Sequence, residues 1–179
     1  MIIQDIFKNI GQIGHILLGG CSIILLWNNS YNLYYYFIGF GLDAILNLIL
    51  KSIFKQPRPD IDETNFNLAL KHGKRFIYNN GLPYDIFGMP SGHSESCLFS
   101  TTFVFLVLRN YKILFGYLLL SILTMAQRVS YNNHTITQVI LGAVVGIIFG
   151  YSIYCVSHQA IKGLVKEKPD DNAPKYLNI

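Results

Sequence analysis

Long apolar runs with few charged residues constrain this chain more than any other feature of its sequence. A helix of about 20 residues crosses a hydrocarbon layer of roughly 30 Å, so an apolar run of that length predicts a transmembrane helix. The chain has 179 residues, of which 51% are hydrophobic and only 13% charged, a balance that is unusual for a soluble domain. Five runs predict membrane spans: Ile10–Trp27, Leu33–Phe54, Ser94–Leu108, Ile113–Gln127 and Thr137–Ser157.

These runs predict an all-α integral membrane bundle formed by one domain, residues 1–179. The third and fourth runs are short, and each reaches spanning length only if its helix includes polar residues at one end, 91–94 or 126–128. Few positive charges and no clean cleavage site accompany the first run, so we expect a retained helix and not a signal peptide. The polar tail from about residue 160 is expected to fray. The oligomeric state is left open.

A polar segment from Pro57 to Pro90 is the only sizeable extramembrane part that the sequence predicts. Long structured insertions are commonly functional, so we expect a lid or rim over a site, although a plain connector would have a similar sequence. Between Asp62 and Tyr78 we expect a short surface helix whose apolar side chains face the membrane: Phe66, Leu68, Leu70 and Phe76.

The spacing of the cysteines argues against a metal site, and the distribution of charge argues against a nucleic-acid-binding site. Three cysteines lie inside apolar runs without metal-ligand spacing, which predicts small core residues: Cys21, Cys97 and Cys155. The net charge of +4 comes from scattered basic residues, so we expect no nucleic-acid-binding groove. Membrane lipids are the expected surroundings.

The second run carries a polar face. Asp43, Asn47 and Lys51 follow one another at intervals of four, which places them on one side of a helix. A charged side chain near the bilayer centre costs about 2.5–3.5 kcal/mol on insertion scales. Asp43 is therefore either functional or paired with a neighbour inside the bundle.

The direction of successive spans decides which polar residues meet. The end of the second run, the start of the third and the link between the fourth and fifth fall on one membrane face, together with the N-terminus. Arginine offers a bidentate fork, lysine a point charge and a helix start further N–H donors, so such a set suits a phosphoryl group. One histidine is then available to attack phosphorus and another to protonate the leaving oxygen. This face receives Lys51, Arg58, Ser91, Gly92, His93, Arg128 and His134.

The stretch from Gly88 to His93 is the predicted helix start at this face. Ser91 and Gly92 are expected to expose backbone N–H groups where the helix dipole favours an anion. His93 would then lie beside that anion. Taken alone, such a stretch is also typical of an ordinary capped helix.

Three sequence blocks carry a resemblance to a known family. The chain has Lys51, six residues, then Arg58-Pro59; it has Pro90-Ser91-Gly92-His93; and it has Arg128, five residues, then His134. In this order the blocks resemble those of the type 2 phosphatidic acid phosphatase superfamily of lipid phosphate phosphatases.

The resemblance implies a mechanism and roles for the residues. His134 would be the nucleophile that forms a phosphohistidine, and His93 the general acid toward the leaving group and later the base toward water. Phosphate oxygens would be held by cations and helix-start donors, with no metal or other cofactor. The implied phosphate-binding residues are Lys51, Arg58, Ser91, Gly92 and Arg128.

Two positions depart from the family pattern. Gln127 stands where the family has Ser, and Gln138 stands where it has an Asp that orients the nucleophilic histidine. Gln138 can accept the imidazole N–H but brings no charge. The residues from Gly88 to Ser91 and from His134 to Val139 are similar to the dolichyl diphosphate phosphatase branch, in which a glutamine is expected at this place.

The sequence thus predicts a multi-pass membrane phosphatase that removes the terminal phosphate of a lipid phosphate or a polyprenyl or dolichyl diphosphate. An alternative from another class is a non-catalytic lipid-phosphate binder or structural membrane protein whose site has degenerated at Gln138. A vanadate-dependent oxidant of the wider superfamily is disfavoured by five spans. Lysine and arginine counts do not predict sidedness, and the resemblance implies a site turned away from the cytosol.

Overall fold

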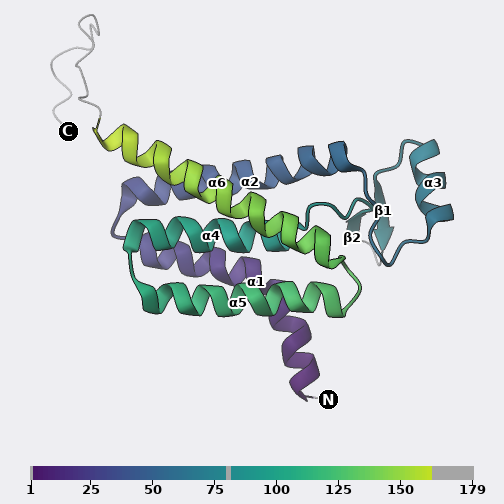
Figure 1. Cartoon of the computed structure of the whole chain (residues 1–179), viewed down its shortest axis with the longest axis horizontal. Coiled ribbons are helices and arrows are strands. Elements are labelled where there is room, and N and C mark those ends of the chain that lie inside the picture. Colours follow the sequence, from purple (N-terminus) through teal and green to yellow (C-terminus); the bar gives the residue numbers. More distant parts are fainter. Residues whose placement is uncertain (1, 80–81, 163–179) are drawn as a thin grey trace, which may run out of the picture.

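The computed structural model describes residues 2–79 and 82–162, and Figure 1 shows a bundle of long helices with a small projection at one end. The predicted all-α membrane bundle is confirmed. The predicted tail lies mostly outside the described residues. The elements are α1 (Ile2–Leu26), α2 (Ser30–Phe54), α3 (Glu63–Lys71), β1 (Phe76–Asn79), β2 (Leu82–Asp85), α4 (Gly92–Leu108), α5 (Tyr111–Ser130) and α6 (Ile136–Lys162).

Among the described residues, four helices are long and apolar enough to cross a membrane: Phe7–Leu26, Ser30–Phe54, Tyr111–Ser130 and Ile136–Gln159. They correspond to the first, second, fourth and fifth predicted runs. The third run forms α4, which has only 17 residues and is therefore about 25 Å long. It contacts α1, α2, α5 and α6, and none of its residues is exposed. The prediction of a fifth span is thus met only in part, because α4 is a short central helix that the other four surround.

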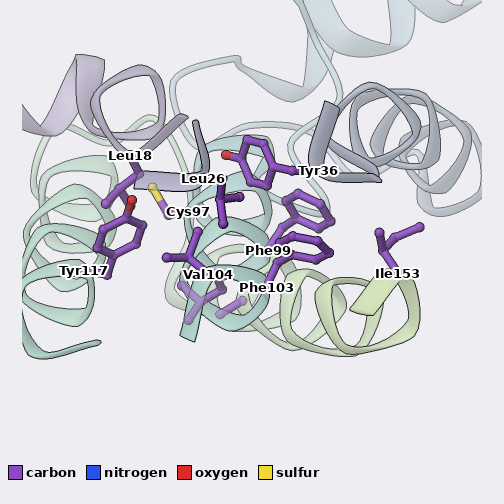
Figure 2. Packing of buried hydrophobic residues seen from close by; sticks show 11 residues of the cluster. Leu18, Leu26, Tyr36, Cys97, Phe99, Phe103, Val104, Tyr117 and Ile153 are labelled. Carbon is purple, nitrogen blue, oxygen red and sulfur yellow. The ribbon is translucent and has the colours of Figure 1, made fainter. Parts of the chain in front are cut away.

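An aromatic cluster fills the middle of the bundle (Figure 2). The ring of Tyr36 on α2 lies 5.7 Å from both Phe99 and Phe103 on α4. Its hydroxyl is hydrogen-bonded to Ser100 Oγ at 2.7 Å, so the buried hydroxyl group has a hydrogen-bond partner. Cys97 belongs to this core as predicted. Cys21 does not, because it is exposed on α1.

Glycines on one side of α6 bring its backbone against α4. A Cβ at Gly142 would collide with the carbonyl oxygen of Ser91, one at Gly146 with that of Glu95, and one at Gly150 would lie 2.8 Å from that of Phe99. Small residues at intervals of four permit this approach between membrane helices. These three glycines, called the glycine ladder below, allow α6 to pack closely against α4.

The segment between α2 and α4 forms a cap, which consists of helix α3 and the antiparallel hairpin β1–β2. The sequence predicted a helix here but not the hairpin. The expected surface helix ends at Lys71 because Gly73 follows with a positive φ of 64°. Phe66 does not face the membrane as expected. Its ring packs 6.0 Å from that of Phe87, and with Ile86 they form a small core of their own.

The ends of the helices lie as span counting predicted. Figure 1 shows the cap, the end of α2, the start of α4 and the α5–α6 link at one end of the bundle. The α1–α2 and α4–α5 links lie at the other end. The three sequence blocks therefore meet at the end that carries the cap.

Candidate active site

Direct contacts join the three sequence blocks at this end. Arg58 Nη1 lies 3.4 Å from Nε2 of His134, and the N–H of Ser91 donates to the backbone carbonyl of Gln138 at 3.0 Å. His134 Nδ1 lies 2.9 Å from the carbonyl oxygen of Gly88. Residues between 46 and 76 positions apart in the chain thus form one site.

The end of strand β2 positions the two cations of the first block. Lys51 is 5% exposed; its Nζ donates to the Phe87 carbonyl at 3.0 Å and lies 3.5 Å from Asp85 Oδ2. Arg58 Nε donates to the Asp85 carbonyl at 2.8 Å, and its guanidinium lies 4.5 Å from the ring centre of Tyr84. Both cations are therefore oriented by the cap, which forms the rim of the site.

Asp85 stays ionised beside these cations. Burial raises the pKa of its carboxyl, but hydrogen bonds from Arg75 and the charge of Lys51 outweigh burial and leave the pKa below its ordinary value. Arg75 donates to both carboxylate oxygens at 3.2 and 3.0 Å. Asp85 was absent from the predicted site, because the sequence gives no sign that the hairpin returns it to Lys51.

Arg128 lies in the last turn of α5 and is 7% exposed. Its carbonyl accepts the N–H groups of Asn133 and His134 at 3.0 and 3.1 Å, which folds the α5–α6 link back onto the site. Its side-chain Nε is buried and has no hydrogen-bond partner among the described residues. A buried donor of this kind calls for a ligand or water.

Hydrogen bonds assign the tautomer of His134, which is 2% exposed. Nδ1 faces two acceptors, the Gly88 carbonyl at 2.9 Å and Gln138 Oε1 at 3.2 Å, so Nδ1 carries the proton. Nε2 then presents its lone pair toward Arg58. Burial and the charges of Arg58 and Arg128 lower the pKa of His134 to about 2. The imidazole is neutral at neutral pH, which is the nucleophilic form.

Gln138 is fully buried and its amide is held at both ends. Nε2 donates to Gln56 Oε1 at 3.0 Å and to the Pro57 carbonyl at 2.9 Å, which turns Oε1 toward His134. A Cβ at Gly88 would lie only 2.6 Å from Oε1, so glycine is needed there. The site therefore contains the predicted Gln138 contact to His134, together with Gln56, which the sequence did not indicate.

The start of α4 differs in one detail from its prediction. Ser91 is the N-cap residue, but its N–H donates to Gln138 O and so does not serve an anion. The Gly92 N–H belongs to the first helical turn, whose donors are free of intrahelical partners. Asn47 supports this turn from behind, because it donates to the Pro90 carbonyl at 3.4 Å and to Glu95 Oε2 at 2.5 Å.

Asp43 lies on the predicted polar face of α2, away from the phosphate-binding residues. Its Oδ2 accepts a hydrogen bond from Ser96 on α4 at 2.8 Å, and the side chain is fully buried. It stands two helical turns from Lys51, a separation of about 12 Å along the helix. This contact favours the pairing interpretation of Asp43.

His93 faces a histidine that the sequence did not place in the site. The ring centres of His15 and His93 lie 4.2 Å apart and the ring planes are tilted by 60°. His15 comes from the first apolar run, where a histidine followed by Ile16 and Leu17 was the available signal.

One known protein family matches this chain over most of its length. The family model of the PAP2 superfamily matches residues 32–162. The chain belongs to the PAP2 superfamily. This confirms the family-level resemblance, whereas the closeness to the dolichyl diphosphate phosphatase branch stays a prediction.

A solved structure supports the PAP2 assignment at the level of fold. The chain is similar to the crystal structure of the first transmembrane PAP2 type phosphatidylglycerolphosphate phosphatase from Bacillus subtilis, with a TM-score of 0.58 and 18% identity over 88% of this chain and 77% of that chain. No curated protein sequence matches the chain. The fold is thus that of a multi-pass membrane protein of the PAP2 phosphatase superfamily.

Proposed function

We propose that this PAP2 protein is a membrane phosphatase that hydrolyses the terminal phosphate of a lipid phosphate or of a polyprenyl or dolichyl diphosphate. The observation that carries the proposal is the state of His134. Its Nδ1 proton is bound by Gly88 and Gln138, and its Nε2 lone pair lies beside Arg58. A fixed neutral imidazole among cations is suited to attack a phosphoryl group.

The first chemical step transfers the phosphoryl group to His134. Its Nε2 lone pair forms the N–P bond while the bond from phosphorus to the leaving oxygen breaks and its electron pair stays on that oxygen. His93 gives its proton to the leaving oxygen. Positive charge on the phosphorylated imidazole is stabilised by the Nδ1–H bonds to Gly88 and Gln138.

The second step hydrolyses the phosphohistidine. His93, now neutral, takes a proton from water as the water oxygen bonds to phosphorus, and the N–P electron pair returns to His134 Nε2. Lys51, Arg58 and Arg128 bind the phosphoryl oxygens, and their charges stabilise the negative charge that these oxygens carry in the transition state. Inorganic phosphate is the product.

We infer that the substrate is a lipid from the membrane-spanning helices around the site and from the sequence similarity at Gln138. Helices long and apolar enough to span a membrane carry the site to one end of the bundle, so a substrate anchored in the bilayer reaches it with its headgroup. The similarity at Gln138 favours a polyprenyl diphosphate. The site is proposed to face away from the cytosol, as the family resemblance implies.

A substrate panel tests the proposal. Purified protein in detergent is incubated with phosphatidate, lysophosphatidate, phosphatidylglycerolphosphate and a polyprenyl diphosphate, and phosphate release is measured. We expect at least one substrate to be hydrolysed by the wild type and none by His134→Ala. No release from any of them, with a wild type indistinguishable from His134→Ala, would instead support the non-catalytic binder.

A further inference from the structure

His15 lies against the residue that the proposed mechanism makes its general acid. The His15 ring on α1 is 4.2 Å from the His93 ring on α4, centre to centre. His15 Nδ1 is buried and has no hydrogen-bond partner among the described residues. The structure thus shows the His15 ring packed against His93 with no hydrogen bond at Nδ1.

Close packing of α1 on α5 brings His15 to this position. A Cβ at Gly11 would collide with the side chain of Gln127, and one at Gly14 with that of Thr124. Both glycines lie within about one helical turn of His15. Bulkier residues there would move α1, and with it the histidine, away from the site.

In-line transfer places His15 on the leaving-group side. His134 attacks phosphorus from one side, so His93, which protonates the leaving oxygen, stands on the opposite side. His15 touches His93 and not His134. Arg128 on α5 is the charged group near both rings, and Arg58 and His134 are the further charged and titratable groups near His93.

We propose that His15 is a positioning residue for His93: its ring packs against the His93 imidazole and holds it toward the leaving oxygen. This inference rests on the proposed function. A fixed ring direction shortens the search for the reactive geometry. Departure of a poor leaving group then depends on His15, while attack by His134 does not.

Leaving-group dependence separates this role from a structural one. An alkyl phosphate needs its leaving oxygen protonated, whereas p-nitrophenolate leaves without a proton. For His15→Ala we expect kcat on a lipid phosphate to fall about 10- to 100-fold, a part of the 10²–10⁴-fold that general acid catalysis typically contributes. Hydrolysis of p-nitrophenyl phosphate should change little. His15→Phe, which keeps a ring against His93, should restore most of the lost rate.

Two controls complete the experiment. His158→Phe removes an exposed histidine that stacks on Tyr154, 5.6 Å away, toward the far end of α6, and should leave both rates unchanged. In a His93→Asn background, His15→Ala should cause no further loss on the lipid phosphate. An equal loss on both substrates, a loss that adds to that of His93→Asn, or a His15→Phe variant as impaired as His15→Ala would overturn the inference.

These outcomes are distinct from failure of the proposed function. If the wild type hydrolyses no lipid phosphate, no polyprenyl diphosphate and no p-nitrophenyl phosphate, the phosphatase proposal fails and the role of His15 fails with it. If the wild type is active and His134→Ala is not, the phosphatase proposal stands and only the His15 variants decide the inference. Thermal unfolding in detergent shows whether His15→Ala remains folded, and the rates of His15→Phe on the two substrates decide the inference if it does not.

Discussion

At the residue scale, Gln138 holds the nucleophilic histidine with a neutral amide. Its oxygen accepts from His134 while its nitrogen donates to Gln56 and Pro57. A carboxylate at the same place would turn a negative charge toward the Pro57 carbonyl and the Gln56 amide oxygen. The glutamine therefore fits its neighbours, and Gly88 supplies a second acceptor for the imidazole proton.

Gln138→Glu tests this arrangement with little change of shape. The variant keeps the oxygen that faces His134 and loses the two N–H bonds. Its second carboxyl oxygen is then buried against two acceptors without a donor, so we expect a loss of about 1–3 kcal/mol in unfolding free energy. Thermal unfolding in detergent measures it. Gln159→Glu, on an exposed part of α6, is the control. A Gln138→Glu variant as stable as this control would show that the amide orientation is assigned wrongly.

The protonation state of His134 gives a second prediction. Burial and the charges of Arg58 and Arg128 lower its pKa to about 2, so the folded protein keeps it neutral while an unfolded histidine gains a proton below about pH 6.5. Stability should therefore fall as the pH drops below that value, and His134→Asn should lessen the fall. In NMR of histidine-labelled protein without substrate, a His134 signal that titrates between about pH 5 and 8 would contradict this.

At the scale of elements, the apolar runs predicted which segments form helices but not how these helices pack against one another. Runs of about 20 apolar residues leave a membrane helix as the only stable form, so α1, α2, α5 and α6 could be predicted. The hairpin could not, because two strands of 4 residues carry too short an alternation to recognise. The central place of α4 depends on the glycine ladder of α6, whose spacing of four was the available signal.

Gly146→Ala tests the ladder. A methyl group there would collide with the Glu95 carbonyl, so α4 and α6 must separate, at a cost of about 1–3 kcal/mol for overpacking. Gly116→Ala on α5 is the matched control, since its Cβ would meet nothing within 4 Å. Thermal unfolding in detergent should show a lower midpoint for Gly146→Ala alone. Equal midpoints for both variants would mean that the helices do not pack this closely.

The site shows the same division. His93, His134 and the three cations could be predicted because block spacing and span direction place them at one face. Asn47, Gln56, Asp85 and His15 could not, because each reaches the site through a contact with a residue distant in sequence. His15 in particular depends on how closely α1 packs on α5.

At the scale of the whole molecule, the site and the α4–α5 link lie at opposite ends of the bundle. In the membrane they should face opposite compartments. Lys74 lies in the cap, between α3 and β1, and Lys112 lies at the start of α5, at the opposite end of the bundle. A cysteine at either position therefore shows which compartment that end faces. In a variant without native cysteines, we expect a membrane-impermeant maleimide added outside intact cells to label Lys74→Cys and not Lys112→Cys. Labelling of Lys112→Cys alone would reverse the proposed orientation, and equal labelling of both would contradict the spanning arrangement.

The central claim is that His134 becomes phosphorylated during turnover. Wild-type protein, mixed with a substrate radiolabelled in its terminal phosphate and quenched in denaturant, should carry label that is stable in alkali and lost in acid, as phosphohistidine is. His134→Ala should carry none. Active wild-type protein without any such label under rapid quenching, or the same label on His134→Ala, would contradict the account.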